Sequence, residues 1–409
     1  MKDQFFKALG LNEISPNSVK ELANDIGIPY SRLKYYNSNN ILPSGADLQK
    51  ILQKMEFSRE QLMLRLGKVD KDLLDRLIEN AEEISKSFFN SNISDDTVKQ
   101  LPRAEFQTHL GSLYRMDCLR FLQSIEDDSI DLIFADPPFN LDKEYPSQIN
   151  DKLHERDYIS WCEEWTKECV RVLKHGGSLF IWNLPKWNTF IANILNNYLT
   201  FRHWISVDIK YSLPIANRLY PSHYSLLYYC KGEKPSVFHP DRIPMPVCPK
   251  CQHDLRDYGG YKSKMNPMGL NLPDVWTDIS PVRHAKYKRR NGSNELPIKL
   301  LDRIIEMSSN ENDIVLDPFG GSGTTFIVSE IKNRRWIGCE IGPLADIVDR
   351  FSHIQEETKY LKELRKNLNK LFTDDTLIER ERKGLWTPDS IKNNTDLTPK
   401  ISKQIKLKL

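Results

Sequence analysis

The sequence predicts an α/β fold with an open sheet, because three segments combine an apolar strand with a polar turn at its carboxyl end. The run 132–135 leads into the turn 136–139, and the run 314–317 leads into a glycine-rich turn. A third run, 336–340, ends in an acidic residue. Short apolar runs bounded by turns are typical of buried strands, and open α/β sheets bind ligands at the carboxyl ends of their strands. We therefore expect these turns to build one ligand site.

The first turn, Asp136-Pro137-Pro138-Phe139, has the groups needed to hold the exocyclic amine of a nucleobase. Asp136 supplies a carboxylate and Phe139 an aromatic face. Proline lacks an N–H and fixes φ, so the turn is stiff and its carbonyls can accept hydrogen bonds. An ordinary surface Asp-Pro turn is the alternative. We predict Asp136, Pro137, Pro138 and Phe139 to be the catalytic residues.

The glycine-rich turn 318–325 is predicted to bind a cofactor. Its glycines let a ligand approach the backbone closely, and Thr324 or Thr325 can cap the following helix. No lysine follows the glycines, which excludes the phosphate-binding loop of nucleoside triphosphatases. Glu340 stands 23 residues after Asp317, and an acid so placed suits hydrogen bonding to ribose hydroxyls.

Together these motifs resemble the DNA amino-methyltransferases, which move a methyl group from S-adenosylmethionine to the exocyclic nitrogen of adenine or cytosine. The target-amine motif precedes the cofactor motif, as in the beta group of that family. The resemblance runs from about Leu110 to Arg365 and includes the segments 116–119, 129–133, 171–181 and 296–301. It implies a Rossmann-like, mostly parallel, seven-stranded sheet with helices on both faces. It also implies these cofactor-binding residues: Asp117, Asp317, Phe319, Gly320, Gly321, Gly323, Thr324 and Glu340.

The resemblance predicts direct methyl transfer to a flipped base, with Asp136 and the carbonyl of Pro137 accepting the amine hydrogens. Aspartate at the head of the motif is usual for adenine in this family and serine is frequent for cytosine N4, so Asp136 favours adenine N6. Cytosine N4 is the alternative. Carbon-5 methylation of cytosine needs a thiolate, usually in a Pro-Cys pair, and no cysteine here follows a proline.

The predicted role is the modification enzyme of a restriction–modification system, with double-stranded DNA as substrate and a cognate restriction endonuclease as partner. Two other classes stay open. One is a transcription regulator whose methyltransferase domain is vestigial, although the intact Asp136 and glycine turn argue against it. The other is an RNA amino-methyltransferase, which fits a large recognition insert less well than duplex DNA does.

Composition agrees with a cytoplasmic protein, and the resemblance implies a prokaryotic or phage source. The 409 residues allow two or three domains, and hydrophobic content of 39% with charged content of 28% is ordinary for a soluble protein. No apolar run approaches the roughly 18 residues of a membrane span, and the N-terminus lacks the apolar core of a secretory signal. Seven cysteines without a regular framework suit a reducing compartment.

Positive charge is concentrated between the two motifs, although the net charge of the chain is only +2. We predict DNA contacts in this segment, with a solvated charged face as the alternative. The predicted contact residues are Arg283, Lys286, Lys288, Arg289 and Arg290. Upstream, basic residues alternate with Tyr258, Tyr261 and Trp276, a mixture suited to phosphate contact and base reading. Residues 212–280 occupy the position of the target-recognition region of the family, and the resemblance implies that role for them.

Residues 1–70 resemble a small repressor-type helix-turn-helix domain, with a turn at Gly27 between two amphipathic helices. In that case Arg32 and Lys34 face the major groove. A plain helical docking domain is the alternative. Residues 71–107 are interpreted as a connecting helix or dimer contact followed by a linker. The remaining predicted parts are the catalytic part 108–211, the cofactor-binding part 281–370 and a polar tail, 371–409.

Cys248 and Cys251 have the spacing of half a zinc knuckle. A tetrahedral site needs two more ligands, and no second Cys-x-x-Cys pair exists in the sequence. The sequence therefore favours no bound metal, with structural zinc as the alternative.

Overall fold

A computed structural model of the protein forms two compact units. One unit comprises Met1–Thr97 with Leu153–Tyr158, and the other comprises Val98–Lys152 with Ile159–Leu409. The structure describes residues 3–88, 101–141, 153–208, 216–217, 219–243, 246, 248, 250, 256–257, 259–260, 269–279, 295–367, 374–385 and 387.

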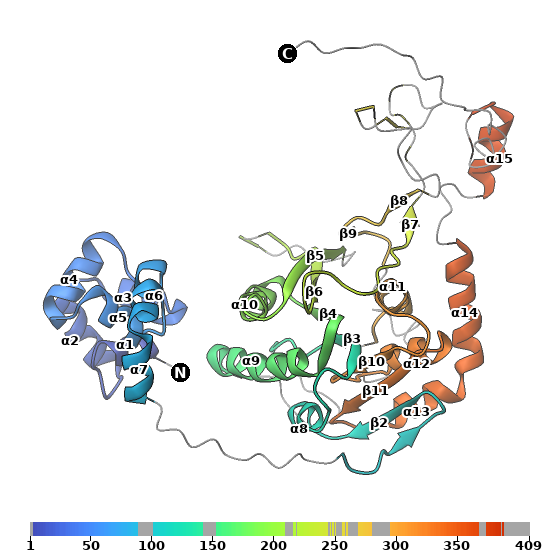
Figure 1. Ribbon diagram of the computed structural model, residues 1–409. Helices are drawn as coiled ribbons and strands as arrows, with labels where there is room; N and C mark the ends of the chain where they lie inside the picture. Colours follow the sequence, from blue (N-terminus) through green and yellow to red (C-terminus); the bar gives the residue numbers. More distant parts are fainter. Residues whose placement is uncertain are drawn as a thin grey trace, which may run out of the picture. The chain divides into compact units, whose positions relative to one another are not determined.

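The larger unit is built on a nine-stranded mixed sheet (Figure 1). In spatial order its strands are β1 (Phe106–Gln107), β2 (Gly111–Arg115), β11 (Arg335–Glu340), β10 (Ile314–Asp317), β3 (Ile130–Ala135), β4 (Leu173–Asn183), β6 (His223–Cys230), β5 (Thr200–Asp208) and β9 (Val275–Trp276). A separate pair consists of β7 (Arg242–Ile243) and β8 (Leu270–Asn271).

The expected mostly parallel α/β sheet is confirmed. From β2 to β4 all neighbouring strands are parallel, whereas β6 runs antiparallel to both β4 and β5. The sheet has nine strands rather than seven because two short strands, β1 and β9, extend its edges.

Helices cover both faces of this sheet (Figure 1). In the figure, α8 (Cys118–Gln123), α9 (Glu155–Val172) and α10 (Pro185–Leu195) lie on one side, and α11 (Ile298–Ser308), α12 (Thr324–Ile331) and α14 (Ile354–Asn367) on the other. The helices α13 (Ala345–Ser352) and α15 (Asp374–Arg382) complete the unit. Central parallel strands covered on both faces read as continuous apolar runs. This explains the run 132–135 of β3, whose four residues are fully buried.

The N-terminal unit contains seven helices among the residues that the structure describes. They are α1 (Gln4–Ala8), α2 (Pro16–Ile26), α3 (Tyr30–Asn39), α4 (Gly45–Met55), α5 (Arg59–Arg65), α6 (Lys71–Glu79) and α7 (Ala81–Phe88). Gly27 ends α2 in the left-handed conformation, with φ 71°, which glycine adopts without the strain of a Cβ. The apolar faces of α2 and α3 meet in the core of this unit, where Ala23, Ile26 and Leu33 are buried.

Residues 71–88 form two helices rather than the single connecting helix expected, because the chain departs from helical geometry at Asn80. Leu73 is buried, whereas Leu74 and Ile78 are 48% and 63% exposed. The dimer contact predicted for this segment stays a prediction.

Candidate active site

The two motif-bearing strands are neighbours at the centre of the sheet. β10 pairs with β3 in parallel, with Val315 opposite Leu132 and Leu316 opposite Ile133. From β10 the chain continues through α12 to β11 on one side, and from β3 through α9 to β4 on the other. Ligands bind in open α/β sheets where the connections diverge in this way, outside the carboxyl ends of the strands. The turn 136–139 and the glycine-rich turn 318–325 both follow strands that end at this point.

Aromatic groups from three elements surround the turn that follows β3. The rings of Phe139 and Tyr224, the latter on β6, have centroids 5.9 Å apart. Tyr224 in turn lies 4.9 Å from the ring of Trp182 on β4. The Trp187 indole N–H donates to the backbone carbonyl of Phe139 at 2.7 Å. Asp136 itself is partly buried. The structure thus holds the turn against an aromatic surface.

Asp317, whose cofactor contact stays a prediction, holds the glycine-rich turn together. The backbone N–H of Phe319 donates to its Oδ1 at 2.9 Å, and the Thr325 hydroxyl donates to its Oδ2 at 2.5 Å. The side chain is buried. Burial raises the pKa of Asp317 to about 7, although these two hydrogen bonds favour the ionised form. Both oxygens are therefore engaged within the turn.

The expected capping of α12 by a threonine is wrong. Gly323 is the N-cap residue, with φ 76°, and no side chain caps the helix. The hydroxyl of Thr325 is committed to Asp317. The hydroxyl of Thr324 donates to the Leu296 carbonyl at 3.2 Å and accepts from Arg350 at 2.7 Å. The two threonines thus bind the glycine-rich turn to its surroundings rather than to its own helix.

Glu340 lies at the carboxyl end of β11, next to the glycine-rich turn. Its two carboxylate oxygens accept from the backbone N–H groups of Gly321 at 2.8 Å and Gly342 at 2.7 Å. On the adjacent strand, Asp117 follows the end of β2 and caps α8 by accepting from the N–H groups of Leu119 and Arg120. The structure therefore places both predicted acids at the same sheet edge as Asp136.

Aromatic side chains also flank the glycine-rich turn 318–325. Phe319 packs against Trp161 and Trp165 of α9, with ring centroids 5.8 Å and 5.3 Å away. Trp165 is fully buried, and its indole N–H has no hydrogen-bond partner among the described residues. The glycine-rich turn therefore contacts α9 through Phe319 and the end of β11 through Gly321 and Glu340.

Trp276 is not available for reading bases, contrary to the expectation from its aromatic and basic neighbourhood. It is 3% exposed, donates its indole N–H to the Pro273 carbonyl, and lies beneath the Arg303 guanidinium at 4.8 Å. Moreover, β6 falls within the range 212–280 assigned to target recognition, yet it is an inner strand of the sheet. The target-recognition role of the range stays a prediction.

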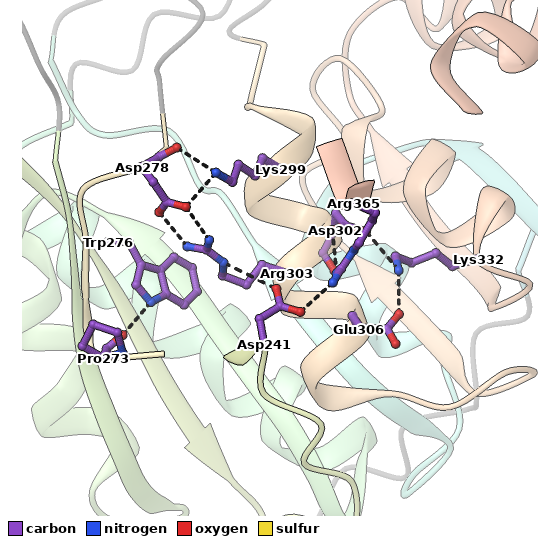
Figure 2. A network of polar contacts seen from close by, with 10 residues as sticks. All are labelled: Asp241, Pro273, Trp276, Asp278, Lys299, Asp302, Arg303, Glu306, Lys332 and Arg365. Atoms are coloured by element: carbon purple, nitrogen blue, oxygen red, sulfur yellow. Dashed lines mark hydrogen bonds and ion pairs between the residues drawn. The ribbon is translucent and has the colours of Figure 1, made fainter. Parts of the chain in front are cut away.

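A polar network around the buried Arg303 and Asp302 ties both ends of the segment 241–278 to α11 and α14 (Figure 2). Both terminal nitrogens of Arg303 donate hydrogen bonds to the Asp278 carboxylate, at 3.0 and 2.7 Å. The Nε of Arg303 lies 3.8 Å from the Asp241 carboxylate. Arg365 then bridges Asp241 and Asp302. Burial alone would raise the pKa of Asp278, but hydrogen bonds from Arg303 and Lys299 outweigh it and hold that pKa below its ordinary value.

Several other predicted site residues lie outside the part of the chain that the structure describes. The undescribed range 280–294 contains the predicted DNA contacts Arg283, Lys286, Lys288, Arg289 and Arg290. Cys251 lies in another undescribed range, 251–255. Cys248 is described and is partly exposed. Within the described ranges no group of three or more His, Cys, Asp or Glu side chains could hold a metal. No helix there is long and apolar enough to cross a bilayer.

Comparison with known proteins agrees with this geometry. Residues 130–346, more than half of the 409, match the N6/N4 methyltransferase family described as DNA methylase. The chain belongs to the N6/N4 DNA methylase family. In that family S-adenosylmethionine is the methyl donor, as the sequence motifs implied.

Individual DNA methyltransferases are similar to this protein over most or part of its chain. Type II methyltransferase M.BamHI of Bacillus amyloliquefaciens is 46% identical over 403 residues, covering 94% of this chain and 95% of that protein. DNA adenine methyltransferase YhdJ of Escherichia coli (strain K12) is 36% identical over 241 residues, covering 58% and 80%. The solved cytosine-N4-specific PvuII DNA methyltransferase is 20% identical with a TM-score of 0.43, covering 61% and 94%.

Sequence reasoning missed Tyr224 and Trp187 of this DNA methylase. In the sequence both resemble core residues, since one lies in an apolar strand and the other in the first turn of a helix that follows a strand. Only the pairing of β6 with β4, which sets Ser225 opposite Asn183, brings Tyr224 to the edge where Phe139 lies.

Proposed function

We propose that the protein is the modification methyltransferase of a type II restriction–modification system. It transfers a methyl group from S-adenosylmethionine to the N6 amine of adenine in duplex DNA. The observation that carries the proposal is the position of Asp136, which follows the central strand β3 beside the glycine-rich turn after β10. The 46% identity to a type II methyltransferase over 94% of the chain supports the restriction–modification role.

The residues at the cofactor turn fit S-adenosylmethionine. Among the described residues, a Cβ at Gly321 would have only the Phe319 carbonyl within 4 Å, at 3.8 Å, which leaves the backbone there open to a ligand. A carboxylate has about four acceptor positions, so Glu340 can accept from ribose hydroxyls beside its two backbone N–H groups. The open face of Gly321 and the carboxylate of Glu340 would hold the cofactor, while Asp317 shapes the turn from behind.

The bound cofactor supplies an electrophilic methyl carbon on a sulfonium centre. The protein's residues make the exocyclic amine a better nucleophile. The Asp136 carboxylate and the Pro137 carbonyl accept the two amine hydrogens, which favours a tetrahedral nitrogen whose lone pair is free to attack. As the nitrogen–carbon bond forms and the sulfur–carbon bond breaks, positive charge develops on nitrogen and Asp136 stabilises it. After the attack the amine proton, now acidic, passes to the Asp136 carboxylate that accepts its hydrogen bond and from there to solvent.

Phe139 holds the extruded base by stacking. Stacking of a base on an aromatic side chain stabilises it by about 1–3 kcal/mol, which offsets part of the few kcal/mol that base extrusion costs. The Trp187 hydrogen bond to the Phe139 carbonyl fixes the backbone that carries this ring. Asp136 at the head of the motif favours adenine over cytosine as the base.

A product analysis tests this function. The protein is incubated with duplex DNA and S-adenosylmethionine labelled in its methyl group, and the DNA is digested to nucleosides. We expect the label in N6-methyladenosine. Label in N4-methylcytosine would overturn the base assignment but keep amino-methyl transfer, and absence of label in DNA would contradict the proposed activity. A restriction endonuclease gene beside the methyltransferase gene is expected as well.

We further propose that the N-terminal unit is a second DNA-binding element that uses α3 as its recognition helix. Gly27 to Pro29 separate α2 from α3, the spacing of a short turn between two helices. Lys34 and Tyr35 are exposed, and α3 contains no acidic residue. Arg32 is less available for DNA contact, because its guanidinium donates to the buried carboxylate of Asp47 at 3.1 Å.

Salt dependence of binding tests the role of α3. Removal of one lysine that binds a DNA phosphate lowers the slope of log affinity against log salt by about 1. We therefore expect Lys34→Ala in the full chain to lower this slope by about 1. Lys7→Ala, an exposed lysine on α1, is the matched control and keeps the slope. Equal slopes for both variants would support the alternative of a helical docking domain.

A further inference from the structure

Two exposed apolar residues stand at the catalytic edge of the sheet. Because β6 is antiparallel to β4, it begins at the edge where the parallel strands end, and its residue Ser225 pairs with Asn183 at the end of β4. Leu219 and Tyr220 come just before β6 and are 95% and 51% exposed. The chain from Leu219 to Tyr224 spans at most about 17 Å, and the Tyr224 ring packs beside Phe139.

The fold does not depend on packing of the Leu219 side chain. Leu219 has the largest exposed fraction among the described large hydrophobic residues, so its side chain contributes almost nothing to the core. Single exposed apolar residues are common on protein surfaces. Two consecutive ones, five and four residues before Tyr224, whose ring packs against Phe139, suggest a role in substrate binding.

The proposed reaction requires such groups. Extruding a base unpairs it and leaves a gap in the base stack. Proteins that distort DNA insert apolar side chains between base steps, and aromatic rings stack on exposed bases. Leucine and tyrosine are thus suited to occupy the space that the extruded base leaves.

We propose that Leu219 and Tyr220 enter the duplex at the position vacated by the target base and stabilise the extruded state. Leu219 acts as the wedge, and Tyr220 stacks on the adjoining base. Both are positioning residues that do not touch the reacting atoms. This inference rests on the proposed function, because it requires a base to leave the duplex.

The test compares a fully paired target with one in which the target base faces a mismatch, since a mismatched base is easier to extrude. For Leu219→Ala we expect kcat/KM on the paired duplex to fall by about tenfold, with recovery to within a few-fold of the parent on the mismatched duplex. Ile378→Ala, which removes a 65% exposed apolar side chain on α15, is the matched control and leaves both values unchanged.

Fluorescence provides a second measurement that a loss of stability would not mimic. With 2-aminopurine at the target position, we expect the parent to raise the emission on binding and Leu219→Ala to raise it less at saturating protein. Unchanged activity of Leu219→Ala on the paired duplex, or an equal loss on both duplexes, would overturn the inference. If the parent methylates neither duplex, the proposed function itself fails and the inference with it.

Discussion

Asp136→Asn is expected to lower kcat for methyl transfer by about 10²–10³-fold, the usual cost of removing one group that stabilises transition-state charge. Asparagine has nearly the same shape and keeps one acceptor oxygen, but it has no negative charge to balance the positive charge that develops on the amine. Asp136 follows β3 on the target side of the site, whereas the cofactor turn follows β10. The affinity for S-adenosylmethionine should therefore change little.

Single-turnover methylation and calorimetric titration with S-adenosylmethionine measure these two effects separately. Asp131→Asn is the matched control, because Asp131 lies at the start of β3, the strand that Asp136 follows, and pairs with Lys174 at 2.7 Å. It should lose some stability and keep the parental kcat. A fully active Asp136→Asn variant, or one that loses cofactor binding to the same degree as activity, would refute the role of Asp136.

Gly323→Ala is expected to destabilise the protein considerably more than Gly321→Ala. Both glycines have positive φ, 76° and 51°, so alanine at either position adds about 1–2 kcal/mol of backbone strain. The space around them differs. A Cβ at residue 323 would stand 2.7 Å from Cγ2 of the buried Ile347, whereas the nearest atom at residue 321 is 3.8 Å away. Overpacking adds about 1–3 kcal/mol at Gly323 alone.

Urea unfolding of the two variants measures this difference in the free energy of unfolding. The double variant Gly323→Ala/Ile347→Ala completes a cycle, because removal of Cγ2 relieves the clash. We expect the double variant to be more stable than the sum of the two single losses predicts. Equal destabilisation at residues 321 and 323, or full additivity in the cycle, would show that Ile347 does not limit the space.

The local sequence correctly predicted the strands that carry the motifs. The run 132–135 predicted a buried strand because a central parallel strand has no solvent-facing side, and all four residues are buried. The positions of Asp136, Asp317 and Glu340 at one sheet edge followed from the same reasoning, since each comes at the end of a parallel strand.

The partners of individual side chains could not be predicted in this way. Asp317 and Thr325 are eight residues apart, and their hydrogen bond depends on how the intervening turn folds back. Trp276 looked like a base-reading residue because it is close in sequence to basic and aromatic residues. Its burial depends on Arg303, which comes from the helix α11 that precedes the second motif. Such contacts between distant segments leave no local pattern.

The anchoring of Asp241 and Asp278 by the single guanidinium of Arg303 has an evolutionary consequence. A stretch of chain that departs from and rejoins the same fixed point can vary in length at little entropic cost, since doubling a loop adds only about 0.6 kcal/mol. Insertions and rewritten sequences between β7 and β8, within this stretch, would leave the nine-stranded sheet and both turns undisturbed. If target recognition lies in this stretch, as predicted from the sequence, new DNA specificities arise there while the chemistry is inherited intact.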